Sequence, residues 1–510
     1  MSSQQTPGRE PPVVVIGAGP TGLSAAYHLG SDALLIEGRS EVGGWCRSIT
    51  DHGFTFDYAG HIMFTNDPYV LQLYDMLLGE NMHWQDREAW IYSKGTYTRY
   101  PFQGALYGLP PEVIKECIVG AIEARFGSLS NPRHGDTAPA QADYTGPDRR
   151  GMFEPLLRKE GEIAGSVRPG YHGTDRRRRT LPKGPPRNFE EFIYKVWGAG
   201  IAKHFAIPYN QKLWAVPLSE METSWLGGRV PLPNLEEMID GALQPVGKPM
   251  GPNARFGYPL RGGFQALMDG FLPHLQGELR LGTRVVEISP KQRTLRTGDG
   301  RTVAYEQLIS TMPLPALVAV IGKEAPPEIQ AAAKALRHVS VRCVNIGVGR
   351  EALTEKHWIY YPEDTVFHRI FVQGNASPHC NPPGGFGLTC EITYSEAKPL
   401  PWEGEALIQR CIEDCIRVGI FNADDPIICA NQVDMPVAYV VYDHDRAANV
   451  NLIREWLSNY DIILAGRYSE WEYYNSDHAF IAGKKAADQA RAAQQEQFMA
   501  FPRTAQLSER

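Results

Sequence analysis

One stretch near the N-terminus, residues 13–23, constrains the fold of this chain more than any other. Its first four residues are apolar and β-branched, which predicts a short strand buried on both faces. Gly17, Gly19 and Gly22 then form the pattern G-x-G-x-x-G, and apolar residues follow at helical spacing. Such glycines permit a tight turn, a close approach of phosphate to the backbone, and close packing of helix on strand. The stretch therefore predicts a dinucleotide-binding unit with its phosphates at a helix N-terminus.

A second apolar run strengthens this prediction. Residues 33–36 read as a strand that ends in Glu37, twenty residues after the first glycine. An acidic side chain at this place accepts hydrogen bonds from the ribose hydroxyls of an adenine dinucleotide. Gly43, Gly44 and Arg47 follow, a continuation more typical of flavoproteins with two dinucleotide-binding domains than of NAD dehydrogenases. The expected cofactor is therefore FAD.

Composition and charge narrow the class of protein. The chain has 510 residues, of which 43% are hydrophobic and 21% charged, ordinary values for a globular protein of two or three domains. Its net charge of −7 offers no basic field to nucleic acid, and no apolar run approaches the roughly 20 residues that span a bilayer. Eight cysteines without a C-x-x-C pair, and a polar N-terminus without a secretory core, predict reduced thiols and a cytoplasmic protein. We therefore expect neither a nucleic-acid nor a membrane partner, and a homo-oligomer is one option.

The order of predicted elements gives the domain organisation. Because the chain begins with the nucleotide-binding strand and ends with another strand and helix, we predict an α/β fold with a discontinuous Rossmann-like FAD-binding domain. This domain takes residues 11–99, 246–334 and 456–500. An inserted helical domain takes 100–245, and an inserted antiparallel β-sheet domain takes 335–455, where apolar residues alternate with period two. Ligands are expected where the three parts meet.

Residues 127–187 differ in character from their surroundings. They contain twelve Lys or Arg against seven Asp or Glu, many Gly and Pro, and little periodicity. This composition favours a basic, disordered insertion in the helical domain. A phosphate or nucleic-acid contact is the less favoured interpretation.

Six stretches carry a family likeness. They are residues 59–64 (AGHIMF), 100–103 (YPFQ), 208–217 (PYNQKLWAVP), 225–234 (WLGGRVPLPN), 251–254 (GPNA) and 466–473 (GRYSEWEY). On these residues the chain resembles the UDP-galactopyranose mutases, and the eukaryotic-type members more than the short bacterial ones. The likeness extends over nearly the whole chain apart from 127–187.

The resemblance implies an isomerase with no net redox change. The expected reaction interconverts the pyranose and furanose forms of a nucleoside-diphosphate hexose such as UDP-galactose. Reduced FAD is expected to act as nucleophile through N5 and to form a flavin–sugar adduct, so the cofactor carries the covalent chemistry and the protein holds charge and geometry. The nucleotide sugar is the expected partner.

The resemblance also assigns residues. Expected to be catalytic are His61, Arg229, Arg369 and Arg467. Expected to bind the cofactor are Gly17, Gly19, Pro20, Thr21, Gly22, Glu37, Gly43, Gly44, Trp45, Arg47, Gly60 and Asp477. Expected to bind substrate are Phe64, Gln103, Tyr209, Asn210, Trp214, Arg229, Asn253, Tyr360, Arg369, Tyr439 and Tyr473. The two arginines of this last set suit a diphosphate because the guanidinium fork matches phosphate oxygens.

Two alternatives stay open, because Trp45 and Arg47 depart from the family pattern beside the expected flavin. One is a mutase-like enzyme on another nucleotide sugar, for example GDP-linked, that does not use flavin as nucleophile. A divalent metal would then neutralise the diphosphate, with these weak candidate ligands: Asp443, His444, Asp445, Asp477 and His478. The other is an FAD-dependent oxidoreductase of the amine-oxidase kind. The favoured interpretation includes no metal.

Overall fold

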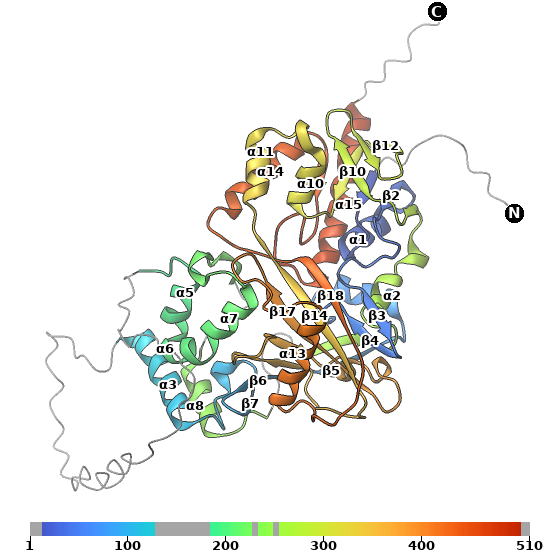
Figure 1. The fold of residues 1–510 in the computed structure, drawn as a ribbon. Helices are drawn as coiled ribbons and strands as arrows, with labels where there is room; N and C mark the ends of the chain where they lie inside the picture. Colours follow the sequence, from blue (N-terminus) through green and yellow to red (C-terminus); the bar gives the residue numbers. More distant parts are fainter. Residues whose placement is uncertain (1–12, 128–183, 227–232, 248–253, 501–510) are drawn as a thin grey trace, which may run out of the picture.

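The computed structural model describes residues 13–127, 184–226, 233–247 and 254–500, with side chains to 495 (Figure 1). Most of the predicted insertion at 127–187 therefore lies outside the described residues. The described part contains a parallel sheet, a helical block and a large antiparallel sheet, which matches the predicted fold class. Within these residues, every helix is too short or too polar to span a bilayer.

The nucleotide-binding unit is a five-stranded sheet in the order β19-β13-β1-β2-β9, with all described pairs parallel. Its strands are β1 (Val13–Ile16), β2 (Ala33–Ile36), β9 (Glu278–Arg280), β13 (Gln307–Ser310) and β19 (Ile462–Leu464). Strands from three distant segments thus form one sheet, as the sequence predicted. Helices α1 (Pro20–Leu29) and α15 (Ser476–Ala500) pack together, and a Cβ at Gly483 would lie 2.2 Å from the Thr21 carbonyl oxygen.

Smaller elements surround this sheet. They are the hairpin β3 (Ser48–Asp51) and β4 (Phe54–Asp57), α2 (Pro68–Leu78), the pair β5 (Met82–Asp86) and β8 (Arg255–Pro259), α9 (Gln265–Asp269), the sheet β10 (Val285–Ser289), β11 (Thr294–Thr297) and β12 (Thr302–Ala304), and helices α10 (Leu314–Ile321), α11 (Pro327–Ala335) and α14 (Arg446–Ser458). The sequence pattern predicts one helix over residues 265–275, but the structure divides it, because α9 ends before Gly270 and a separate 3₁₀ turn covers Leu272–His274.

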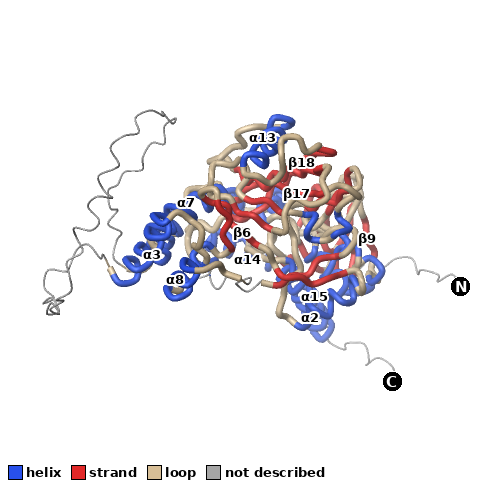
Figure 2. Tube along the Cα trace, turned by 90° about the horizontal axis from the view of Figure 1, so that it is seen from below, coloured by secondary structure: helices blue, strands red, loops and turns tan. Residues whose placement is uncertain are grey.

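The helical block lies at one end of the molecule, where α3, α7 and α8 group together (Figure 2). Its helices are α3 (Pro111–Phe126), α5 (Phe189–Phe192), α6 (Ala199–Ile201), α7 (Ile207–Trp214) and α8 (Leu235–Leu243), with π-helical turns at Ile193–Trp197 and Ala202–Ala206. Asn188 before Phe189 predicts a helix N-cap from the sequence, and this is confirmed, since its side chain accepts the Glu191 N–H at 2.9 Å. Glycines allow α3 and α6 to touch: a Cβ at Gly200 would lie 2.0 Å from the Glu116 carbonyl oxygen.

The large sheet has seven strands in the order β18-β14-β17-β16-β15-β6-β7. Its strands are β6 (Ala89–Ser93), β7 (Thr96–Arg99), β14 (His338–Val348), β15 (Trp358–Tyr360), β16 (Arg369–Phe371), β17 (Phe386–Tyr394) and β18 (Ile427–Val440). Helix α13 (Gly404–Arg417) packs on one face, and β4 approaches β17. Burial on two faces explains why β17 is buried along almost its whole length.

One predicted boundary does not follow the sheets. We assigned residues 89–99 to the FAD-binding domain, but β6 pairs in parallel with β15 and so forms an edge of the large sheet with β7. The hairpin was recognisable from local alternation, whereas its partner strand lies about 270 residues away and leaves no local signal. The other domain boundaries stay predictions.

Candidate functional site

A cavity of about 1440 Å³ lies between the parallel sheet and the large sheet. Its lining runs from the glycine turn after β1 to the ends of β15, β16 and β18. The following predicted site residues line it: Gly17, Gly19, Pro20, Thr21, Glu37, Gly44, Trp45, Gly60, His61, Phe64, Tyr360, Arg369, Tyr439, Arg467 and Tyr473. Side chains separated by several hundred residues in sequence therefore converge on one space.

One end of the cavity is the glycine turn, and its backbone suits a dinucleotide. Gly17 has φ +97°, a conformation that favours glycine, and a Cβ at Gly22 would lie 1.8 Å from the Gly17 carbonyl oxygen. Glu37 accepts the Ala18 N–H at 2.8 Å and the Arg39 N–H at 2.9 Å, which fixes its carboxylate beside the turn. A carboxylate with four lone-pair sites can still accept ribose hydroxyls. The residues present fit the adenosine and pyrophosphate of FAD.

A sharp turn before His61 forms the wall in the middle of the cavity. Ala59 has φ +72°, and a Cβ on Gly60 would meet Phe371 Cγ and Trp358 Nε1, each at 2.8 Å. The Gly60 N–H donates to Glu391 Oε1 at 3.1 Å, so a buried carboxylate holds the turn. Only glycine fits this position without displacing neighbouring rings.

The His61 side chain is a neutral ring in this setting. It stacks on Phe264 with ring centroids 5.3 Å apart. Burial, with a contribution from the charge of Arg467, lowers the pKa of His61 to about 4. At neutral pH the imidazole therefore carries no positive charge.

The other end of the cavity collects arginines and tyrosines. Tyr360 and Arg369 are directly paired across β15 and β16. Arg369 forms an ion pair with Glu391, which also holds the Gly60 turn. Burial opposes the charge of Arg369, but the Glu391 carboxylate raises the pKa of the guanidinium well above its usual value. A permanently charged guanidinium thus faces the cavity.

Arg467 lies between this cluster and the glycine turn. Its guanidinium donates to the backbone oxygens of Tyr474 and Ala438, both at 2.9 Å. Its charge lies 5.1 Å from the ring centroid of Tyr439 and 4.8 Å from that of Tyr473. The two backbone bonds fix the cation in place at the cavity lining.

Arg87 is a cavity residue that sequence reasoning missed. It lines the cavity, and its Nη2 donates to the Tyr360 hydroxyl at 2.7 Å. The Nε atoms of Arg87, Arg369 and Arg467 are all buried and find no hydrogen-bond partner in the described part of the chain. Because the three arginines all line one cavity, their positive charge makes this edge of it suited to an anion.

Two further residues were missed. Tyr100 lines the cavity and packs on Tyr360 with centroids 5.2 Å apart, and it belongs to one of the stretches quoted for the resemblance. Glu391 is fully buried in the apolar strand β17. A carboxylate inside an otherwise buried strand is a signal that the sequence does carry, because a buried charge needs a partner.

Several predicted residues do not line the cavity. They are Gly22, Gly43, Arg47, Asp477, Gln103, Tyr209, Asn210 and Trp214. The Asn210 side chain donates back to the Ala206 carbonyl at 2.8 Å, and Arg47 Nε donates to the Gly44 carbonyl at 3.0 Å. These bonds direct both side chains into local structure, and the predicted contacts of the eight residues with cofactor or substrate stay predictions.

The aromatic residues of this group form a layer behind the lining. Tyr209 meets Tyr360 edge-on at 5.5 Å between centroids. Trp214 packs at 6.0 Å from Tyr439 and 6.5 Å from Tyr473. Both side chains come from α7, so the helical block supports the tyrosines that face the cavity.

Two predicted substrate residues, Arg229 and Asn253, lie outside the described residues, and their roles stay predictions.

The predicted weak metal ligands at 443–445 and 477–478 are not gathered into one group. Among the residues that the structure places, the cluster with ligand-like spacing is Asp51 and His52 on the hairpin with Cys429 on β18, and none of the three lines the cavity. Trp45 does line the cavity, and its indole N–H donates to the Val437 carbonyl at 3.1 Å.

The parallel sheet, the glycine turn and the cavity that extends from it define a flavoenzyme fold of the Rossmann-like class. Residues 15–77 match the NAD(P)-binding Rossmann-like domain, and residues 216–491 match the flavin containing amine oxidoreductases. The second match covers more than half of the chain, and the protein belongs to that family.

Solved structures show the same fold. A reduced UDP-galactopyranose mutase is 28% identical over 95% of each chain, with a TM-score of 0.80. A fatty acid isomerase from P. acnes that produces CLA is 12% identical over 95% of this chain and 99% of its own, with a TM-score of 0.57. A redesigned putrescine oxidase is 15% identical over 94% and 98%, also with a TM-score of 0.57. The last two are similar in fold alone.

Proposed function

We propose that the protein is a flavin-dependent mutase that interconverts the pyranose and furanose forms of a nucleoside-diphosphate hexose such as UDP-galactose. The observation that carries this proposal is that three arginines, Arg87, Arg369 and Arg467, line the same cavity as the glycine turn. A diphosphate supplies anionic oxygens that suit guanidinium donors. The 28% identity to a UDP-galactopyranose mutase over 95% of both chains supports the same class of substrate.

The two ends of the cavity have different roles, one for the cofactor and one for the substrate diphosphate. The N-terminus of α1 and the glycine turn hold the cofactor pyrophosphate, with Glu37 at the ribose. Bound reduced flavin would supply a nucleophilic nitrogen for the anomeric carbon of the sugar. Arg369 and Arg467 bind the substrate diphosphate, which must leave as an anion and return, and the tyrosine hydroxyls donate to the same oxygens.

The neighbouring residues orient these groups. Glu391 holds both the Gly60 turn and Arg369, so the position of the diphosphate is tied to the wall of the flavin site. His61 is neutral and stacked, which gives it a role in shaping that wall rather than in donating a proton at neutral pH. The layer of rings on α7 keeps bulk water from the phosphate oxygens, which strengthens their ion pairs.

An oxidoreductase of the amine-oxidase kind is the second candidate, and the family match favours it. A cationic cavity is poorly suited to a cationic amine, however, because a protonated amine would have to enter beside three guanidinium groups. A metal-assisted mutase on a GDP-linked sugar is the third interpretation. Its candidate ligands are dispersed, as described above.

One experiment separates the three. The purified protein is examined for flavin absorbance and incubated with UDP- and GDP-sugars, with and without dithionite and with and without divalent metal. Furanose product that requires reduced flavin is the expected result. Metal-dependent turnover by colourless protein would replace the proposal with the third interpretation, and hydrogen peroxide released from amines would replace it with the second.

A further inference from the structure

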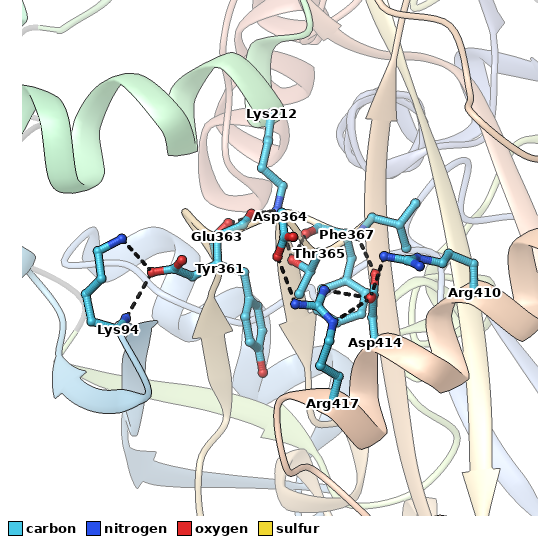
Figure 3. A network of polar contacts seen from close by, with 11 residues as sticks. Lys94, Lys212, Tyr361, Glu363, Asp364, Thr365, Phe367, Arg410, Asp414 and Arg417 are labelled. Carbon is cyan, nitrogen blue, oxygen red and sulfur yellow. Dashed lines mark hydrogen bonds and ion pairs between the residues drawn. The ribbon is translucent and has the colours of Figure 1, made fainter. Parts of the chain in front are cut away.

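Helix α7 carries a lysine, Lys212, that lies outside the cavity lining and outside every role assigned so far. Its Nζ donates to the carbonyl oxygens of Tyr361 and Glu363 and to Thr365 Oγ1, each at 2.9 Å. An ammonium has three N–H donors, so all of them are used on one short loop. Figure 3 shows the side chain reaching from α7 to this loop.

The loop that Lys212 holds, residues 361–368, connects β15 to β16. Tyr360 and Arg369 stand at its two ends, are paired with each other, and both line the cavity. A displacement of the loop therefore moves the cationic edge of the cavity directly. The same helix packs Tyr209 against Tyr360 and against His368, so the bond and the ring contacts act on one edge.

Loop 361–368 is also bonded to helix α13 and to the β6–β7 turn. Asp414 on α13 accepts the Val366 N–H at 2.7 Å, and its buried carboxylate is balanced by Arg410 and Arg417. Glu363 accepts from the Lys94 backbone at 2.9 Å in the β6–β7 turn (Figure 3). These bonds fasten the loop within the large sheet, whereas Lys212 fastens it to the helical block.

We infer that Lys212 is a positioning residue, which sets the separation and orientation of Tyr360 and Arg369 for a diphosphate by tying loop 361–368 to helix α7. The inference rests on the proposed function in so far as the ligand is a diphosphate. Loss of the three donors removes the hydrogen bonds of Lys212 to the carbonyl groups of Tyr361 and Glu363, which favours movement of the loop toward water.

The test compares three variants of the FAD-loaded full chain at a temperature where circular dichroism shows all of them folded. Lys212→Met keeps the length of the side chain and removes the donors. Lys94→Met is the matched control, because it removes a lysine of the β6–β7 turn that contacts the same loop through an exposed Lys94–Glu363 ion pair of 3.4 Å. Thr365→Val removes one of the three acceptors of the Lys212 ammonium, and it takes the place of Lys212→Met as the test variant if Lys212→Met does not fold.

Hydrogen exchange over residues 360–371 and UDP binding by calorimetry are the readouts. We expect Lys212→Met to accelerate exchange at least tenfold through Arg369 and to raise the Kd for UDP about tenfold, with flavin absorbance unchanged. Thr365→Val should show a smaller change of the same kind, and Lys94→Met should stay within twofold of wild type. An unchanged Kd for UDP in both Lys212→Met and Thr365→Val would overturn the inference even if the loop exchanged faster.

The failure of the proposed function would look different. If wild-type protein bound neither UDP nor inorganic pyrophosphate, the proposed substrate class would be wrong. Exchange alone would then decide the role of Lys212: acceleration that reaches Tyr360 and Arg369 supports positioning, and acceleration confined to 361–368 contradicts it.

Discussion

At the scale of single residues, the site depends on the ion pairs and hydrogen bonds that fix its charged side chains. Arg369 is fastened by Glu391 on one side and presents its remaining donors to the cavity. Because Glu391 also accepts the Gly60 N–H, one carboxylate sets the distance between the flavin wall and the phosphate edge. The carboxylate would be costly in this buried place without both partners.

Replacing Arg369 by alanine should weaken diphosphate binding. A hydrogen bond to a charged group contributes about 1.5–3 kcal/mol, so the KM for the nucleotide sugar should rise at least tenfold and turnover should fall. Arg342→Ala is the matched control, since Arg342 pairs with Asp434 at 2.9 Å outside the cavity lining. Steady-state kinetics measure the KM and the turnover of both variants. Equal KM values in Arg369→Ala and Arg342→Ala would contradict the assignment of Arg369 to the diphosphate.

The glycine turn makes a second prediction at this scale. A Cβ at Gly22 would lie 1.8 Å from the Gly17 carbonyl oxygen, so Gly22→Ala must open the turn that receives the pyrophosphate. We expect this variant to be purified with less FAD per chain, measured by the ratio of absorbance at the flavin band to that of protein. Gly247→Ala is the control, because no atom of the described residues lies within 4 Å of its added Cβ. Full flavin occupancy in Gly22→Ala would refute the role of the turn.

At the scale of elements, short polar links join segments that are distant in sequence. His357, next to β15, receives the Glu88 N–H on Nδ1 at 2.9 Å and contacts Gln85 Oε1 through Nε2 at 3.2 Å. These bonds connect the end of β5 and the start of β6 to β15. His357 Nδ1 must carry no proton if it is to accept the backbone N–H. Burial lowers the pKa of His357 to about 4, which favours this neutral form of the ring.

This link predicts a pH dependence of stability. In the unfolded chain the His357 ring takes up a proton near pH 6.5, whereas in the folded protein it does so only near pH 4. Between these values the unfolded state binds more protons, so the free energy of unfolding falls as the pH decreases from about 6.5 to 4. His357→Asn keeps an acceptor and cannot titrate, so urea titrations across this range should give a shallower dependence than wild type.

The control for this prediction is His379→Asn, which replaces an exposed histidine. Its dependence on pH should follow that of the wild type. If His357→Asn and wild type lost stability in parallel, other groups would be responsible, and His61, whose pKa is also about 4, would be the next to replace.

At the scale of the whole molecule, the cavity belongs to no single sheet or helix. Its lining combines the glycine turn, the ends of β15 and β16, and the segment after β19. A ligand that spans it therefore stabilises all these parts together.

We expect UDP to raise the unfolding temperature of the whole chain. Ligand at about 100 times its Kd adds roughly 2.7 kcal/mol to the free energy of unfolding. Galactose without a diphosphate should give no shift, and the shift with UDP should be lost in Arg369→Ala. A thermal shift assay measures all three, and an equal shift by galactose and UDP would contradict a site built for a diphosphate.

Much of the local structure was predictable from sequence. The strand, glycine turn and helix at 13–29, the cap at Asn188 and the alternating strands after residue 338 all follow from short-range patterns and are confirmed. The division of the helix predicted over 265–275 was not anticipated from local pattern. Gly270, at the break, packs closely on α2, where an added Cβ would lie 2.4 Å from the Leu77 carbonyl oxygen. Family likeness supplied most of the cavity residues that local patterns do not mark.

By itself, the sequence determined the dinucleotide-binding unit and the fold class, since spacing and residue type act over a few residues, whereas most side chains that line the cavity were predicted only through the family resemblance. Only the tertiary structure decided that residues 89–99 join the large sheet, that Glu391 reaches Gly60 across 331 residues, and that Arg87 completes the cationic edge. Strand pairing and burial of charge depend on partners distant in the chain, and periodicity does not encode which partner is chosen.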